Sequence, residues 1–88
     1  MIEKIIKQLD GLHKEIRKVM PLVQGQVNDV IDGRMTDTKY IEGILDDILG
    51  IVPLGYGVEE FRKLNHYYST FSPDNSAVYQ RYLDESLE

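Results

Sequence analysis

Residues 2–31 read IEKIIKQLDGLHKEIRKVMPLVQGQVNDVI, and apolar side chains recur along this stretch at alternating intervals of three and four positions. One apolar row is Ile2, Leu9, Ile16, Val23 and Val30, a second is Ile5, Leu12 and Val19, and Ile6, Met20 and Val27 widen the stripe beside His13. Residues three and four apart are neighbours on a helix surface, so both rows share one face. The pattern predicts a long helix whose apolar face is covered by the rest of the chain.

Pro21 lies inside this predicted helix. A proline in a helix interior removes one backbone hydrogen bond and clashes with the preceding turn, at a cost of about 3 kcal/mol. The stretch is therefore either one kinked helix or two helices, with Pro21 in the first turn of the second. The apolar rows keep their phase across Pro21, which falls on the outer face, and this favours one helix over 2–31, kinked at Pro21. Gly33 then suits a left-handed helix stop.

Three shorter helices are predicted over 37–49, 58–70 and 73–85. Thr36 and Asp37 are candidate N-caps for the first of them, Gly50 is its stop, and Ser72-Pro73-Asp74 is a start signal for the last. The expected buried faces are Tyr40, Ile41, Ile44, Leu45, Ile48 and Leu49; then Val58, Phe61, Leu64, Tyr68 and Phe71; then Val78, Tyr79, Tyr82 and Leu83. The sequence therefore predicts an all-α fold, with one helical domain over 1–88 built as a small bundle of about four helices.

Composition sets limits on stability and on the kinds of partner. A chain of 88 residues with 42% apolar and 28% charged side chains forms one small domain, for which an additional subunit interface is a reasonable expectation. Residues 1–20 carry five basic and three acidic side chains, whereas residues 21–60 carry two basic and eight acidic ones. The acidic middle disfavours binding of nucleic acid. Acidic mimicry of a nucleic acid would need the carboxylates of residues 29–47 aligned on one ridge.

The sequence contains no recognisable catalytic, metal-binding or phosphate-binding motif. The chain has no cysteine, which excludes thiolate catalysis and cysteine metal sites. The acidic set Asp29, Asp32, Glu42, Asp46 and Asp47 lacks the spacing of a calcium loop, and Glu-x-x-His is missing. The segment 50–57, GIVPLGYG, lacks the GxxxxGK[ST] of a phosphate loop. We therefore expect no catalytic residue, no cofactor and no metal site.

The cellular location is predicted from the length of the apolar runs and from the composition of the N-terminal residues. No apolar run approaches the length of a membrane span, so no membrane partner is expected. The N-terminal residues MIEKIIKQLDGLHKEI carry charges in each turn and lack the apolar core of a signal peptide. A cytoplasmic location is the expectation.

The segment 50–57 is the candidate interaction surface. Its glycines and proline forbid regular structure, yet Ile51, Val52, Leu54 and Tyr56 are too apolar for a solvated loop. Tyr67, Tyr68 and Phe71 on the following helix extend the surface with residue types favoured at interfaces. Tyr56 is the expected anchor. The alternative is that the segment caps the open end of the bundle and is used within the chain.

These features predict a non-catalytic module for protein–protein interaction or regulation, which binds another protein or a second copy of itself. The alternative is a helical protein that binds a small ligand through the polar aromatic residues of the third and fourth helices, which are His66, Tyr67, Tyr68, Tyr79 and Tyr82. Tyrosine commonly lines cores and interfaces with its ring buried and its hydroxyl at the edge, so packing or partner contacts are preferred.

Overall fold

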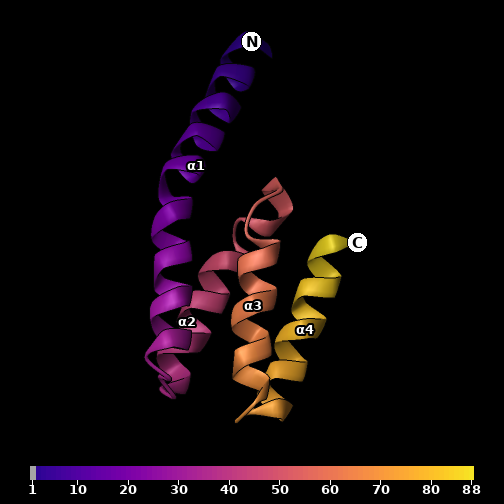
Figure 1. Ribbon diagram of the computed structural model, residues 1–88. Coiled ribbons are helices and arrows are strands. Elements are labelled where there is room, and N and C mark those ends of the chain that lie inside the picture. Colours follow the sequence, from indigo (N-terminus) through magenta and orange to yellow (C-terminus); the bar gives the residue numbers. More distant parts are fainter. Residues whose placement is uncertain (1) are drawn as a thin grey trace.

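The protein is an all-α bundle, as the sequence predicts. The computed structural model describes the backbone of residues 2–88 and the side chains of residues 10–88. Its elements are α1 (Ile2–Asp32), α2 (Thr38–Leu49), the 3₁₀ turn η1 (Val52–Leu54), α3 (Val58–Ser69) and α4 (Pro73–Leu87) (Figure 1). Helices account for 82% of the chain, and the described residues form no strand.

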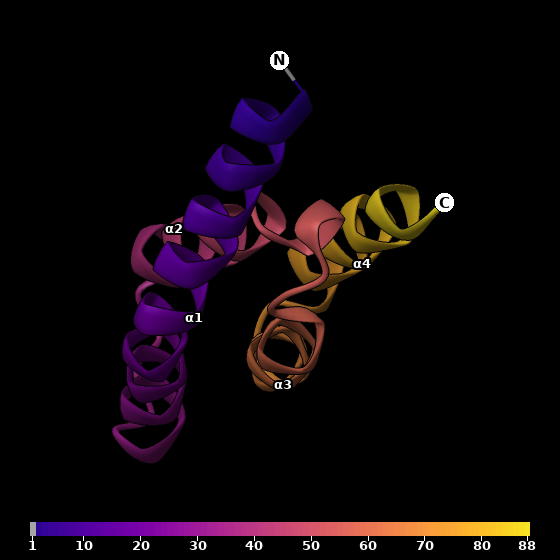
Figure 2. The ribbon, with the colours of Figure 1, turned by 90° about the horizontal axis from the view of Figure 1, so that it is seen from above.

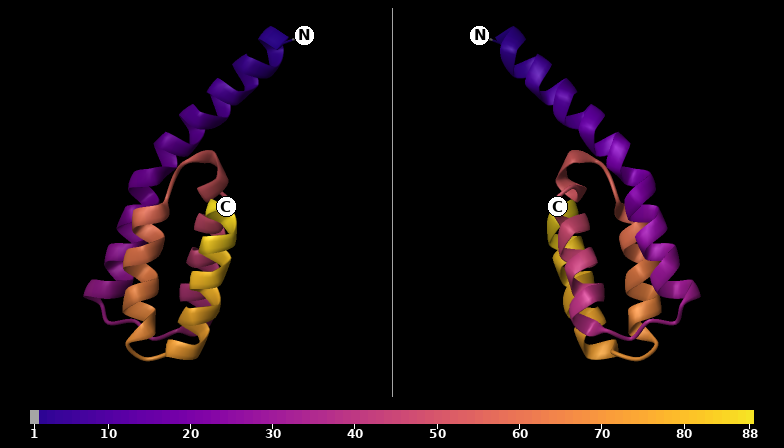
Figure 3. Two further views of the ribbon diagram at one scale, coloured as in Figure 1. Left: turned by 90° about the vertical axis from the view of Figure 1, so that its right-hand side faces the viewer. Right: turned by 90° about the vertical axis from the view of Figure 1, so that its left-hand side faces the viewer.

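Seen from above, α1 and α2 lie toward one side of the bundle and α3 and α4 toward the other (Figure 2). α1 also contacts α3, and η1 lies against α2 and α4 at one end of the bundle. The N-terminal part of α1 continues well past the ends of the other helices (Figure 3). This extension helps to give the molecule its longest dimension of 49 Å, against 26 and 18 Å across. We call residues 2–12 the arm.

The core draws on every element but on only part of α1. Its buried members are Val27 and Val30 of α1; Ile41, Ile44, Leu45 and Ile48 of α2; Val52 of η1; Phe61, Leu64 and Tyr68 of α3; and Tyr79 and Leu83 of α4. Each fully buried side chain of this size contributes about 1.5–3 kcal/mol relative to exposure. The main core contribution of α1 therefore comes from its last third, with Ile16 buried nearer the middle of the helix, and the arm lies beyond both.

α1 runs through Pro21 as one continuous helix, and Pro21 is exposed, as predicted. The kink at Pro21 stays a prediction. The prediction that both apolar rows face the core is wrong for Leu12 and Val19, which are 44% and 42% exposed. Heptad rows drift around a straight helix by about 20° per heptad, and the body covers one side of α1 only. The predicted row members Ile2, Ile5, Ile6 and Leu9 lie outside the described side chains.

The prediction that Gly33 adopts the left-handed conformation at the end of α1 is wrong. The left-handed residue is Arg34, with φ of 50°. The N–H of Met35 donates to the carbonyl of Val30 at 3.0 Å and that of Arg34 to Ile31 at 3.2 Å, which is the Schellman pattern. Gly33 is needed for space, since a Cβ there would lie 2.9 Å from the carbonyl oxygen of Asp29.

The other helix ends follow the predicted signals closely. Asp37 caps α2 by accepting from the backbone N–H of Tyr40 at 3.2 Å, and the helix ends before Gly50. Pro73 opens α4, but Ser72 makes no side-chain cap bond to the helix backbone. The predicted inward positions of Tyr40 and Tyr82 are wrong, because both side chains lie at the rim and are exposed.

The segment 50–57 is more ordered than its composition suggests. The sequence predicts no regular structure here, yet Val52–Leu54 forms a 3₁₀ turn with a proline in its first positions. Gly55 and Gly57 hold left-handed φ values of 93° and 88°, which reverse the chain on either side of Tyr56. A Cβ at Gly57 would also lie 2.8 Å from Cγ2 of Ile48. Two glycines thus allow the segment to fold back onto the bundle.

Candidate functional site

Tyr56 connects the segment 50–57 to α1. Its hydroxyl shares a hydrogen bond with Nδ1 of His13 at 2.8 Å and accepts from Nε of Arg17 at 3.4 Å. The rings of His13 and Tyr56 lie 5.5 Å apart. The side chain predicted to anchor a partner is therefore half-buried and already bonded within the chain.

The other residues of the predicted interaction surface do not form one exposed patch. Val52 and Tyr68 are buried in the core, where a partner does not reach them. Ile51, Leu54 and Tyr67 are half-buried, and Phe71 is exposed. Since η1 lies against α2 and α4, the segment closes one end of the bundle, as the alternative interpretation expects.

The tyrosines of α3 and α4 bind carboxylates of α2. Glu42 and Asp46, one turn apart, accept hydrogen bonds from the hydroxyls of Tyr68 at 2.7 Å and Tyr79 at 3.0 Å. Burial, and then these hydrogen bonds, raise the pKa of both tyrosines, so both hydroxyls stay protonated. These donors hold three helices together. Sequence reasoning considered these carboxylates as metal ligands or as part of an acidic ridge. The signal it missed was their spacing of four beside the apolar face of α2.

The aromatic residues of α3 and α4 that were predicted to form one polar site make separate contacts. The hydroxyl of Tyr67 donates to the carbonyl of Met35 at 2.8 Å, beyond the end of α1. Phe71 packs edge-on against Tyr67 and Tyr68, with ring centres 5.4 and 5.5 Å apart. Tyr82 packs in the same manner on Tyr79 at 5.4 Å. The ring contacts thus form one group at the end of α3 and another on α4, and no ring–ring contact joins the two groups among the described residues.

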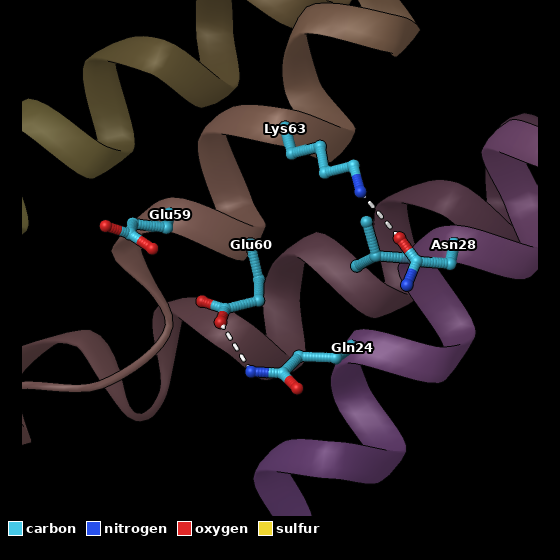
Figure 4. Close-up of a pocket in the computed structure, with 6 residues that line it drawn as sticks. Gln24, Asn28, Glu59, Glu60 and Lys63 are labelled. Atoms are coloured by element: carbon cyan, nitrogen blue, oxygen red, sulfur yellow. Dashed lines mark hydrogen bonds between the residues drawn. The ribbon is translucent and has the colours of Figure 1, made fainter.

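A groove between α1 and α3 is one of several open hollows on the described surface (Figure 4), and other hollows reach about 340–410 Å³. The volume of this groove, about 240 Å³, is below the roughly 300–1,000 Å³ of small-molecule sites. Nε2 of Gln24 donates to Glu60 at 3.2 Å, and Nζ of Lys63 donates to Asn28 at 2.6 Å across the groove. Because its polar side chains bond to one another, the groove fixes α1 on the body and offers few free donors to a ligand.

The described residues hold no group of three or more histidine or acidic side chains placed to bind a metal ion. Within that same part of the chain, no helix has the length and apolar character needed to cross a membrane.

Three exposed apolar residues of α1 form a line along the helix, beside the face that the body covers further along. Leu12, Val19 and Leu22 are 44%, 42% and 69% exposed, and Glu15 lies between the first two. Positions 12, 15, 19 and 22 alternate by three and four, so they share one face of the helix. We call this set the outer stripe. One feature of the sequence indicated this stripe: Leu22 is apolar but falls outside both predicted apolar rows.

Searches of protein-family models, curated proteins and solved structures find no match for this chain. Its functional interpretation therefore rests on the geometry of the bundle and of the outer stripe.

Proposed function

We propose that this protein is a non-catalytic helical module that binds proteins through the outer stripe of α1. The observation that supports the proposal is the set of three aligned apolar side chains, exposed by 42–69% over about three helical turns. Single exposed apolar residues are common on any protein surface, whereas several aligned on one helix face, even with Glu15 between two of them, are a candidate contact surface. Helices bind one another through anchors at this spacing.

The way α1 is held supports the same proposal. Tyr56 binds His13 and Arg17, while Glu60 binds Gln24, so the body grips one side of the helix before and after Pro21. The outer stripe lies on the side of α1 away from these contacts. A partner that docks there meets a helix already ordered and loses little conformational entropy on binding it.

The proposal includes the absence of catalysis and a cytoplasmic location. The absence of catalysis is inferred from the lack of a recognisable catalytic motif in the sequence.

The test compares the wild type with a variant that carries Leu12→Gln, Val19→Gln and Leu22→Gln. We expect the variant to keep its helix content by circular dichroism and to lose protein binding, measured by sedimentation and by pull-down from the source cell. A matched control carries Tyr40→Gln and Tyr82→Gln, two exposed apolar positions on α2 and α4. Identical binding by all three proteins would refute the proposal.

A further inference from the structure

We infer that the partner of the outer stripe is a second copy of this chain, bound antiparallel along the whole of α1. This inference rests on the proposed function and names its partner. It follows from the position of the stripe in the helix, from the charges beside the stripe, and from the surface that a stable complex needs.

The stripe is centred on its helix. Position 17 lies halfway between Leu12 and Leu22, and it is also the midpoint of α1 between Ile2 and Asp32. A two-fold axis at position 17 sets Leu12 of one copy opposite Leu22 of the second and overlaps the two α1 helices from end to end. The arm, which extends past its own body (Figure 3), then lies along the last third of the second copy's α1.

Charge selects the antiparallel orientation. In a parallel pair, equivalent positions meet, and Glu15 faces Glu15 of the second copy within the apolar stripe. In the antiparallel pair centred on position 17, Glu15 instead lies beside Lys18 of the second copy, because both lie toward the same edge of the stripe. Lys18 and Glu15 are both exposed and free to reach across.

The charge distribution along α1 favours the same orientation. The arm carries Lys4 and Lys7 but also Glu3 and Asp10, so its net charge is zero, whereas residues 22–32 carry Asp29 and Asp32 and no basic side chain. Antiparallel overlap places the arm of each copy, with its zero net charge, along the acidic end of the other, whereas a parallel pair brings the two acidic ends together. The two helix dipoles are then also opposed, which is the favourable arrangement.

Surface area requires the full overlap. A stable complex buries about 800 Å² on each partner, which is more than three side chains supply. Overlap of two 31-residue helices makes a contact about 46 Å long. Self-association through the entire helix therefore fits the size of interface that a stable dimer needs, whereas a contact limited to the stripe does not.

Disulfide trapping tests the antiparallel register of the two α1 helices. Because the chain has no native cysteine, only the introduced cysteines can cross-link. The double variant Leu12→Cys/Leu22→Cys should form a covalent dimer on mild oxidation. Each single variant should not, because like positions lie about 15 Å apart in this pairing, beyond the roughly 4.4–6.8 Å between Cα atoms that a disulfide spans. Cross-linking of the single variants would show a parallel pair and overturn the inference.

A charge exchange provides a second measurement that leaves the apolar residues in place. Glu15→Lys should weaken the dimer about fivefold by sedimentation equilibrium, and adding Lys18→Glu should restore it. Asp10→Lys is the matched control, since it makes the same change of charge on an exposed residue away from the stripe. Equal weakening by Glu15→Lys and Asp10→Lys, or no rescue by the exchange, would contradict the antiparallel register.

Sedimentation of the wild type distinguishes failure of this inference from failure of the proposed function. If it sediments as a monomer at high concentration but loses binding of other proteins when the stripe is made polar, the second copy is the wrong partner and the proposed function stands. If the stripe affects neither self-association nor binding of other proteins, both fail.

Discussion

The hydroxyl of Tyr56 lies 2.8 Å from Nδ1 of His13, across 43 positions of sequence. This hydrogen bond, with the longer one from Nε of Arg17, ties the segment between α2 and α3 to α1 close to the point where α1 leaves the body. The part of α1 next to the arm is therefore bound by a residue outside α1.

Tyr56→Phe removes these hydrogen bonds and keeps the ring. Because a buried or half-buried hydrogen bond contributes about 0.5–1.5 kcal/mol, we expect the free energy of unfolding to fall by about 1 kcal/mol in urea titrations. Hydrogen exchange should also become faster at the amides around His13. Tyr40→Phe, at an exposed tyrosine, is the control and should change little. Equal effects from both variants would show that the Tyr56 hydroxyl adds nothing to stability.

Gly57→Ala and Gly43→Ala should change stability in opposite directions. At Gly57 a Cβ would lie 2.8 Å from Cγ2 of Ile48, and φ is 88°, so alanine should destabilise the fold by at least about 1 kcal/mol. At Gly43 on α2, an added methyl group would meet nothing within 4 Å, and alanine should stabilise by up to about 1 kcal/mol. Thermal unfolding of the two variants measures both effects, and a shift of the same sign would contradict the assigned backbone.

Ile16 and Leu12 lie one turn apart but differ in burial. Ile16 is 5% exposed, so Ile16→Ala should cost about 2–5 kcal/mol of folding free energy. Leu12 belongs to the outer stripe, and Leu12→Ala should cost less than about 1 kcal/mol when unfolding is measured on dilute protein. Similar losses for both would place Leu12 in the core after all.

High pH should unfold the protein through Tyr68 and Tyr79. Their pKa values are raised by burial first and by the bonds to Glu42 and Asp46 second. Below about pH 10 both are protonated in the folded and unfolded states, and their contribution to stability is complete. Above that pH the unfolded chain ionises first, so the contribution is lost as pH rises toward the folded values. Tyrosinate absorbance and circular dichroism, recorded together, should show part of the ionisation coinciding with loss of helix.

The Tyr68→Phe/Tyr79→Phe variant provides the control for this titration. It should lack the ionisation phase that accompanies loss of helix, because both late-titrating hydroxyls are gone. Full ionisation of the wild-type tyrosines with its helices intact would contradict the assigned hydrogen bonds.

Local signals in the sequence predicted the helices well. Asp37 before α2, Gly50 after it and Pro73 at the start of α4 act through backbone chemistry that neighbours in sequence determine. The helical period also identified most of the core of α2 and α3. Periodicity shows that a face is apolar, but it does not show how far along a helix the covering elements reach.

The outer stripe shows why the site could not be predicted. Leu12 and Ile16 have the same local signature, and only the position of the body distinguishes the exposed one from the buried one. Tyr68 and Glu42 are 26 positions apart, so their hydrogen bond depends on how α2 and α3 meet. Such pairings are tertiary, and one sequence does not specify them through spacing.

Pro21 interrupts the backbone hydrogen bonds of α1. Its nitrogen carries no hydrogen, so the carbonyl of Arg17 has no donor one turn along the helix. The side chain of the same Arg17 contacts the hydroxyl of Tyr56. The missing backbone bond thus lies within the stretch of α1 that Tyr56 and Glu60 hold against the body. The residue whose carbonyl loses its helical donor at Pro21 is therefore also the residue whose side chain binds the segment 50–57.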